Sequence, residues 1–368
     1  LGGIEEQGLL LFERKPLGNA NTDPNVHYQD MGLLLFDADR DGDNDLYIVR
    51  GGYQAKAGSP DYRDQFYVND GKGNFVQNSF AFPRDFTSKS CVRAADYDRD
   101  GDLDLLVAGR VKPWSYPESV SSFVFRNDSR DGKIRFTDVT AHVAPDLVNA
   151  GLVCDAVFSD FDNDGWKDLI LAGEWMPLTF LKNDRGRFRN VTAATGISGH
   201  KGWWNSVVGG DFDNDGDTDY IVGNVGQNSL FQATAEHPAS VYAKDFDHNG
   251  SYDAFPALYF RTSQQDPTRK EYPVHMRDDA VKQMISMRAK FQNYKTYAEA
   301  PMGQFLTSEQ LEGALVLKAT ELRSGYCRNE GNGKFTLAPL PYTAQLSALN
   351  GMIAYDFDGD GNLDVLMN

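Results

Sequence analysis

Short apolar runs and strongly acidic turns alternate along most of this 368-residue chain. The runs GLLLF (32–36), CVRAA (91–95) and DAVFS (155–159) each precede an acidic segment, and short aliphatic runs that mostly end in glycine follow. Apolar runs of this length, bounded by turn residues, are typical of β-strands. The pattern therefore predicts a repeated unit of strand, acidic turn and strand.

A second pair of strands is predicted after most of these units. An apolar run is followed by a turn rich in Asn, Asp and Gly and then by a phenylalanine, which is Phe75, Phe136, Phe188 or Phe335. Such turns suit tight hairpins because Asn, Asp and Gly tolerate positive φ. Each unit is therefore expected to be a four-stranded antiparallel meander, although the fourth unit has only SLFQ (229–232) as a clear outer strand.

The repeat spacing indicates the architecture. The acidic segments start 59, 64, 51, 34 and 111 residues apart, a period typical of radially repeated β-sheets rather than helical solenoids. We predict an all-β fold, a single seven-bladed β-propeller of four-stranded antiparallel blades over residues 1–368. The predicted blades cover about 26–86, 87–145, 146–198, 199–238 and 239–342, with half-blades at 1–25 and 343–368.

The fifth unit carries a long insert at about 261–318. Two stretches in it, 277–298 and 307–319, have helical spacing, and Asp278 or Thr307 could cap these helices. We expect a helical excursion between the second and third strands of one sheet.

The six acidic segments share the nine-residue pattern D-x-D-x-[DN]-G-x-x-D. Ca²⁺ prefers six to eight oxygen ligands, and such a loop supplies side-chain oxygens at positions 1, 3 and 5 and a backbone carbonyl at position 7. Position 6 is always glycine and position 7 varies, as expected if position 7 contributes only its carbonyl; the aspartate at position 9 would complete the site. The predicted metal ligands are Asp37, Asp39, Asp41, Asp43 and Asp45; Asp96, Asp98, Asp100, Asp102 and Asp104; Asp160, Asp162, Asp164, Trp166 and Asp168; Asp211, Asp213, Asp215, Asp217 and Asp219; Asp245, Asp247, Asn249, Ser251 and Asp253; and Asp356, Asp358, Asp360, Asn362 and Asp364.

An EF-hand and a metal-free acidic turn are the two other interpretations of these loops. An EF-hand begins in the same way but requires a glutamate at position 12 and helices on both sides. Solvated acidic turns without a metal are the second alternative, but four or five carboxylates held in one short loop repel each other strongly unless a cation offsets them. Position 12 is never glutamate here: it is Ile48, Val107, Leu171, Val222, Pro256 or Met367.

The composition narrows the possible partners. The formal net charge is −17, and 26 of the 53 acidic residues lie in the six loops. Nucleic acid is not an expected partner because phosphate contacts need a basic surface. The three cysteines are far apart and predict neither a disulfide framework nor a metal site. No apolar run approaches the length of a membrane span.

The chemistry of the loops also indicates a compartment. Extracellular calcium modules typically bind at roughly 10⁻⁴ to 10⁻³ M, so such sites would be empty in a cytosol. We therefore expect up to six structural Ca²⁺ ions in an extracellular or cell-surface protein.

These features resemble the FG-GAP, or VCBS, repeats of the integrin α-subunit head, a β-propeller with calcium in such loops. The stretches YIVRGGYQAKAGSPDYRDQFYVNDGKGNF, GEWMPLTF, GWWNSVVGGDFDNDGDTD, YPVHMRDDAVKQ and ALNGMIAYDFDGDGNLD are similar to VCBS-repeat proteins of Bacteroidota that are associated with ASPIC/UnbV domains. The resemblance implies an exported or outer-membrane-associated scaffold, with a lipid anchor possible upstream of this chain.

The first functional hypothesis is a non-enzymatic protein-interaction or adhesion scaffold that is a subunit of a surface complex. Met276, Met284, Met287, Phe291 and Tyr294 in the insert are candidate contact residues, unless they pack the insert onto its own blade.

The second hypothesis is a glycan-binding module or a polysaccharide lyase-like enzyme. Trp114, Tyr116, Trp175, Trp203 and Trp204 could stack on sugar rings or could fill gaps between blades. For a lyase, His200 beside Lys201 is the only suggestive pair of a base and a neutralising partner. We expect no enzymatic activity.

Overall fold

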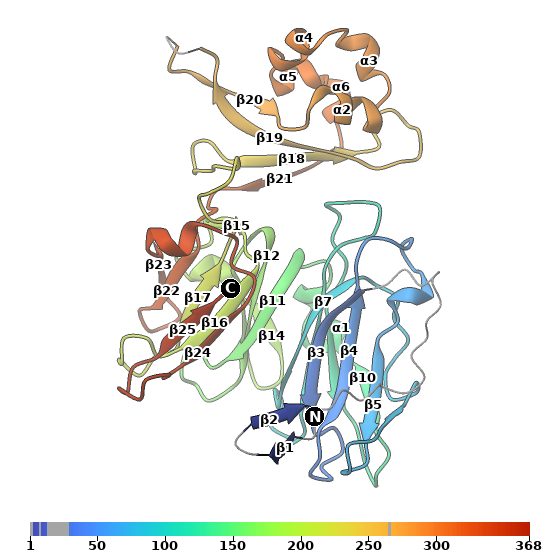
Figure 1. Cartoon of the computed structure of the whole chain (residues 1–368), viewed down its shortest axis with the longest axis vertical. Helices are drawn as coiled ribbons and strands as arrows, with labels where there is room; N and C mark the ends of the chain where they lie inside the picture. Colours follow the sequence, from blue (N-terminus) through green and yellow to red (C-terminus); the bar gives the residue numbers. More distant parts are fainter. Residues whose placement is uncertain (1–2, 7–8, 13–28, 264–265) are drawn as a thin grey trace.

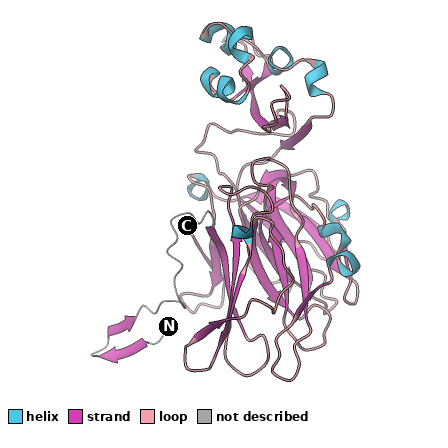
Figure 2. Cartoon of the chain, turned by 90° about the vertical axis from the view of Figure 1, so that its right-hand side faces the viewer, coloured by secondary structure: helices cyan, strands magenta, loops and turns pink. Residues whose placement is uncertain are grey.

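Antiparallel β-sheets make up most of this protein, as the sequence predicts (Figure 1). The computed structural model describes residues 3–6, 9–12, 29–263 and 266–368. Most of its sheets form two parts: a row of sheets, and a smaller unit of strands and helices beyond one end of that row (Figures 1 and 2).

Three sheets of the row are complete four-stranded meanders. They lie within the predicted units 26–86, 87–145 and 146–198. The first consists of β3 (Gln29–Phe36), β4 (Asp45–Gly51), β5 (Gln65–Asn69) and β6 (Phe75–Gln77); the second of β7 (Lys89–Ala95), β8 (Asp104–Gly109), β9 (Phe123–Asn127) and β10 (Phe136–Asp138); the third of β11 (Leu152–Ser159), β12 (Asp168–Pro177), β13 (Thr179–Asn183) and β14 (Phe188–Asn190). Strand β15 (Lys201–Trp203) pairs with β12, and the short helix α1 (Thr140–Val143) follows β10.

The fourth sheet is built from two distant parts of the chain. Strands β16 (Ser206–Gly210) and β17 (Asp219–Gly223) pair with β22 (Gly325–Asn329) and β23 (Phe335–Pro339), with Tyr220 opposite Cys327. The predicted units 199–238 and 239–342 are therefore wrong in their strand assignment: SLFQ (229–232) forms no strand, and the hairpin that ends at Phe335 completes the fourth sheet. The prediction failed because it paired strands with their neighbours in sequence.

The segment between β17 and β22 forms the inserted unit. It is a sheet in the order β20-β19-β18-β21 with five short helices. The chain leaves and re-enters the fourth sheet at adjacent points, since the amide of Gly226 donates to the carbonyl of Leu322 at 2.8 Å. The elements are β18 (Ala239–Lys244), β19 (Asp253–Arg261), β20 (Arg269–Pro273), α2 (Arg277–Gln283), α3 (Met287–Lys290), α4 (Tyr294–Ala298), α5 (Met302–Phe305), α6 (Ser308–Leu311) and β21 (Leu315–Ala319).

This arrangement corrects the predicted insert at 261–318. The helices lie between β20 and β21, and the residues predicted as one helix at 307–319 form α6 and then strand β21, whose β-branched and aliphatic residues pair with β18. Thr307 caps α6 as expected, in a capping box with Gln310. Asp278 is not a cap, because it lies inside α2.

Two-stranded hairpins complete the described strands. They are β1 (Gly3–Glu6) with β2 (Leu9–Phe12), inside the predicted half-blade 1–25, and β24 (Met352–Tyr355) with β25 (Asp364–Met367), inside the predicted half-blade 343–368. The remainder of the first half-blade, from residue 13 to residue 25, lies outside the described residues.

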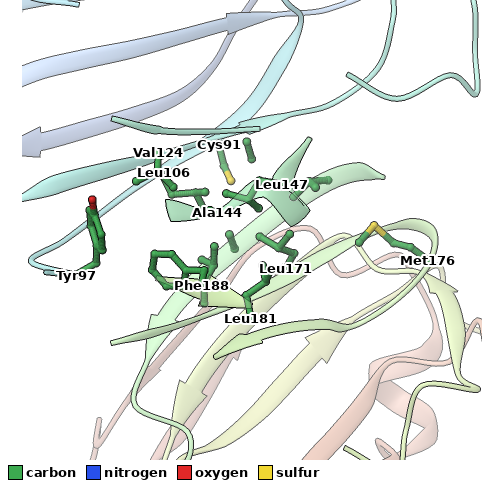
Figure 3. Packing of buried hydrophobic residues seen from close by; sticks show 14 residues of the cluster. Cys91, Tyr97, Leu106, Val124, Ala144, Leu147, Leu171, Met176, Leu181 and Phe188 are labelled. Atoms are coloured by element: carbon green, nitrogen blue, oxygen red, sulfur yellow. The ribbon is translucent and has the colours of Figure 1, made fainter. Parts of the chain in front are cut away.

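The first strands of neighbouring sheets lie side by side, in the order β3, β7, β11, β16 and β24 (Figure 1). Apolar side chains fill the space between the sheets. Figure 3 shows the cluster between the second and third sheets, where Leu106 and Val124 face Leu171, Leu181 and Phe188. Alternating residues of β8 and of β12 enter the clusters on the two sides of their sheets, so the second and third sheets are each stabilised by both neighbours.

The faces at the two ends of the row are exposed, in contrast to the buried faces between the sheets. Met31, Leu33 and Leu35 of β3 are 44%, 65% and 57% exposed, and Ile353 of β24 and Leu366 of β25 are 59% and 61% exposed. The first and last sheets therefore each have an apolar face that no described residue covers.

The inserted unit has a core of its own. Met284, Met287 and Phe291, three of the five candidate contact residues, are buried in this core, whereas Met276 and Tyr294 are 75% and 63% exposed. Met284, Met287 and Phe291 therefore pack the inserted unit, as the alternative to a contact surface predicts.

No helix among the described residues is long and apolar enough to cross a membrane.

Candidate metal centre

Each acidic loop joins two successive antiparallel strands, as predicted. Five loops lie in the row, between β3 and β4, β7 and β8, β11 and β12, β16 and β17, and β24 and β25. They lie at the end of the row that is remote from the inserted unit (Figure 1). The sixth loop, 245–253, joins β18 to β19 inside the inserted unit.

The first aspartate organises the backbone of each loop. In loop 37–45, the amides of Asp41 and Gly42 donate to the two carboxylate oxygens of Asp37 at 3.2 and 3.1 Å. Loop 160–168 has the same two bonds to Asp160, at 3.0 and 2.8 Å. The turn requires positive φ at position 6, and Gly42 has φ +95°, which explains the glycine in all six loops.

The ninth aspartate anchors the loop to the sheet. Asp168 is fully buried and accepts from the amides of Phe161 at 3.1 Å and Asn183 at 2.7 Å. Burial raises the pKa of these carboxyls despite the hydrogen bonds, to about 8 for Asp104, about 7 for Asp168 and about 6 for Asp45 and Asp253. A buried carboxylate with a raised pKa is stabilised in its charged form when a cation lies beside it.

Carboxylate oxygens converge in the loops. In each of five loops, three aspartates offer oxygens that all lie within 4.8 Å of one another, a separation that one ion could bridge. The groups are Asp37, Asp39 and Asp41; Asp96, Asp98 and Asp104; Asp160, Asp162 and Asp168; Asp211, Asp213 and Asp215; and Asp245, Asp247 and Asp253.

Several of these oxygens are buried without a partner. Oδ2 of Asp104, Oδ1 of Asp96 and Oδ1 of Asp162 have no hydrogen-bond partner among the described residues, and neither do Oδ1 of Asp43 and Oδ1 of Asp247. A buried charged oxygen without a partner is costly. Hard carboxylate oxygens are the ligands that Ca²⁺ prefers, so the donor set fits this ion.

The predicted ligands do not all take the same part in these groups. Position 9 joins the group in three loops and position 5 in two. The side chain of Asn249, the neutral ligand, accepts from the amide of Ser251 at 2.7 Å. Four side chains at position 7 contact a neighbouring loop, namely Asp102, Trp166, Asp217 and Asn362. This agrees with a contribution to the metal site through the backbone, although Asn362 also donates to Asp360 of its own loop. The carbonyl ligands themselves stay a prediction.

Position 4 was not singled out in the sequence, yet it links successive loops. Arg40 pairs with Asp102 at 2.5 Å, and Arg99 contacts the carbonyl of Gly165 and lies 4.3 Å from the ring of Trp166. Asn163 donates to Asp217 at 2.6 Å, and Asn214 to Asn362 at 2.8 Å. These four residues all have φ between +56° and +62°. The frequent Asn at this position is a signal for such a conformation that the sequence offered.

An asparagine at the end of the third strand makes a second link. Nδ2 of Asn127 donates to the carbonyl of Ala38 in the preceding loop at 3.0 Å. Asn183 and Asn329 do the same to Tyr97 and Phe161, both at 2.8 Å. The loops are therefore joined to each other as well as to their own sheets.

Cations from the third strand also enter two of the loops. Lys182 of β13 contacts Asp162 and lies 2.9 Å from Asp164, and Arg328 of β22 lies 2.8 Å from Asp213. Sequence reasoning missed these residues because the strand that carries them is distant from the loop in sequence.

Comparison with known proteins identifies the repeats. A family model described as FG-GAP-like repeat matches residues 37–107 and 160–222, which contain four of the six acidic loops. The chain therefore contains FG-GAP-like repeats, as the motif predicts. The comparison with curated proteins found no match.

Two solved structures match this chain with low TM-scores. One is an Agrocybe aegerita lectin, described for its specific recognition of non-reducing terminal N-acetylglucosamine; it is 15% identical with a TM-score of 0.31, over 93% of this chain and 85% of the lectin. The other is the V. cholerae biofilm matrix protein Bap1, which is 10% identical with a TM-score of 0.29, over 92% of this chain and 66% of Bap1.

Proposed function

We propose that this protein is a calcium-stabilised β-propeller scaffold that acts outside the cytosol and without enzymatic activity. The observation that carries the proposal is the set of buried carboxylate oxygens that converge in the repeated loops without a partner. Ca²⁺ supplies the positive charge that these oxygens need. The residues of the chain hold each loop in place through the first and ninth aspartates.

The propeller arrangement is supported by the packing of the row. Neighbouring sheets pack through their apolar faces, and the two end faces of the row present exposed Leu33, Leu35, Ile353 and Leu366. Further sheets on these faces would close a ring. The seven-bladed count stays part of the proposal, since the described row has four complete sheets and one two-stranded hairpin, β24 with β25.

The location is proposed from the chemistry of the loops. Sites with the typical affinity of extracellular calcium modules fill only where calcium is abundant. We place the protein at the cell surface of a Gram-negative bacterium, associated with the outer membrane, with other surface proteins as partners.

The inserted unit is the proposed contact region. Met276 and Tyr294 line a groove of about 750 Å³ that also includes Phe260 and Arg277. Exposed apolar residues around a groove are typical of interaction sites. The unit suits this role because it extends beyond the row. Its two connections to the fourth sheet lie next to each other, since Gly226 is hydrogen-bonded to Leu322.

Removal of the cation tests the proposal. In EGTA we expect a lower unfolding temperature than in millimolar CaCl₂, because each site filled at ten times its dissociation constant adds about 1.4 kcal/mol. Equal MgCl₂ is the control, since Mg²⁺ demands a tighter geometry. An unchanged unfolding temperature would reject calcium stabilisation. Deletion of residues 227–321 removes loop 245–253 but should leave the calcium effect of the five loops in the row, and it should abolish the capture of surface proteins.

Glycan binding is the second candidate function. A cleft of about 310 Å³ between the row and the inserted unit is lined by aromatic residues. Of the five predicted stacking residues, Tyr116, Trp175 and Trp203 line the cleft, although Trp175 is largely buried; Trp204 is buried, and Trp114 is 48% exposed. Clefts of this size and apolar character between two units commonly bind small ligands.

A glycan array distinguishes the two functions. Sugar binding that is lost in Trp203→Ala and kept in Trp114→Ala would favour the cleft, and no binding to any sugar favours the scaffold. The lyase alternative depends on His200, which lines another cleft with Glu321 and Arg323; release of unsaturated products from acidic polysaccharides would support it.

A further inference from the structure

One position of the third strand differs among the four complete sheets of the row. It directly precedes the asparagine at the end of this strand, which in three of the four sheets joins the loop to the preceding one. The register shows that the four positions are equivalent, because the residue before each one pairs with the second residue of the strand that follows the loop. The residues are Val68, Arg126, Lys182 and Arg328.

In loop 160–168 this position places an ammonium group among the carboxylates. The Nζ atom of Lys182 contacts Oδ2 of Asp162 and lies 2.9 Å from Oδ2 of Asp164. These are the side chains at positions 3 and 5, which a bound metal would share. The Lys182 side chain is 25% exposed, so much of its length is covered and its charge is held at the loop.

The other three loops form a graded series. Nε of Arg328 lies 2.8 Å from Asp213, and its Nη2 lies 3.8 Å from Asp215. Arg126 instead pairs with Asp128, outside loop 96–104, at 2.9 Å. Val68 brings no charge to loop 37–45. Lys182 therefore contacts both carboxylates of its loop, and Arg328 contacts one closely and the other weakly. Arg126 pairs with a residue outside its loop, and Val68 carries no charge.

We propose that this third-strand residue sets the metal affinity of each loop, with Lys182 acting as a built-in counter-ion that competes with a divalent cation in loop 160–168. The inference rests on the proposed metal binding of the loops. A cation a few ångströms from the metal position repels the metal and occupies its ligands. We expect loops 37–45 and 96–104 to fill first and loop 160–168 to fill last.

Arg99 also faces loop 160–168. It comes from the preceding loop, contacts the carbonyl of Gly165 and lies over the ring of Trp166. Its direct contacts are with a carbonyl and a ring, and its charge is unchanged in Lys182→Met, so the comparison of this variant with the unchanged protein isolates the effect of Lys182.

Trp166 at position 7 provides a reporter for this loop. Tb³⁺ replaces Ca²⁺ at oxygen sites and emits when energy is transferred from a nearby indole. The full chain would be titrated with Tb³⁺ under excitation selective for tryptophan, and Trp166→Phe would assign the signal to this loop. In Lys182→Met the signal should appear at a Tb³⁺ concentration about tenfold lower than in the unchanged protein.

Lys167→Met is the matched control. Lys167 lies in the same loop at position 8, is exposed, and has no ion pair among the described residues, so its removal changes the net charge equally but should shift the titration little. Lys182→Arg keeps the cation and should behave like the unchanged protein. Circular dichroism verifies that each variant is folded.

The outcomes separate the inference from the function on which it rests. Equal titrations of the unchanged protein and Lys182→Met, or an equal shift in Lys167→Met, would overturn the inference while metal binding itself stands. No Tb³⁺ or Ca²⁺ binding at any loop would reject the proposed function as well. As an independent check, Val68→Lys should remove one of the tight sites counted by equilibrium dialysis with CaCl₂; an unchanged number of tight sites would contradict the inference.

Discussion

Loops 37–45 and 160–168 have the same backbone but are neutralised in different ways. In both, the first aspartate accepts from the amides of positions 5 and 6, and the ninth aspartate accepts from the amide of a third-strand asparagine. In loop 160–168 the cation of Lys182 lies against two carboxylates. In loop 37–45 the equivalent residue is Val68, and no cation of the described residues forms an ion pair with the carboxylates of this loop.

The pKa shifts of one carboxyl from each loop, at position 3 in loop 37–45 and at position 5 in loop 160–168, have opposite directions. Burial, together with Asp41 and Asp37, raises the pKa of Asp39. Burial also acts to raise the pKa of Asp164, but the hydrogen bond and charge of Lys182 leave it below its usual value. Repeats with one motif are therefore not equivalent sites, and the residue that makes them differ lies outside the motif.

The largest expected effect concerns what the two loops share. Asp45→Ala and Asp168→Ala should each lower the free energy of unfolding by about 2–4 kcal/mol, because each leaves two buried amides without an acceptor. Urea unfolding in CaCl₂ measures the loss. The Asp→Asn variants keep one acceptor oxygen and should lose less. If only one of the two loops responded, the common anchoring role of position 9 would be wrong.

The next effect is the pH dependence of the metal-free protein. A carboxyl whose pKa is higher in the folded state than its usual 3.8 contributes stability below that value, and this contribution is lost as the pH rises through the folded pKa. Each loss should accumulate from about pH 4 upward and be complete near pH 6 for Asp45, near 7 for Asp168 and near 8 for Asp104.

Urea midpoints in EGTA between pH 4 and pH 9 measure this loss, and saturating CaCl₂ should abolish it. Asp104→Asn should flatten the last step. Metal-free stability that rises over this range would contradict the assignment of raised pKa values.

A smaller effect distinguishes the two loops directly. In EGTA, Lys182→Met should lower the free energy of unfolding by about 1 kcal/mol, since a partly exposed ion pair is lost and two carboxylates remain uncompensated. Saturating CaCl₂ should remove the difference because the metal takes the place of the ammonium. Lys167→Met serves as the control in the same urea titrations. A loss of the same size with and without calcium would mean that Lys182 acts only through packing.

The smallest effect concerns the links between loops. Arg40→Ala removes a half-exposed ion pair with Asp102 and should cost about 0.5 kcal/mol, less at high salt. Unfolding at low and high ionic strength measures it. Asn214→Ala removes an uncharged link and should show no salt dependence; equal salt dependence would indicate that the Arg40 charge is not the cause.

The sequence was sufficient for most strands and all six loops of the repeats, because short apolar runs, glycine at position 6 and Asn-rich turns are local signals. It failed where distant segments pair. The hairpin at Phe335 was recognised as a hairpin, but only the register of Tyr220 with Cys327 assigns it to the fourth sheet. A local pattern has no information about which strand receives a returning chain.

For the candidate site too, the sequence predicted the local features and missed the contacts between distant segments. The spacing indicated which aspartates converge, but the contacts of Lys182 and of Arg40 join segments of different strands or loops. Likewise Met284 and Phe291 have the spacing of a contact surface, and only the packing of five short helices shows that they are buried.

Crystallography in millimolar CaCl₂, with anomalous scattering at a wavelength where calcium contributes, tests the central claim most directly. We predict anomalous peaks between the carboxylates of the acidic loops, strongest in loop 37–45 and weakest in loop 160–168. Loops without a peak, with the aspartates in the arrangement described here, would contradict the claim that divalent cations neutralise these repeats.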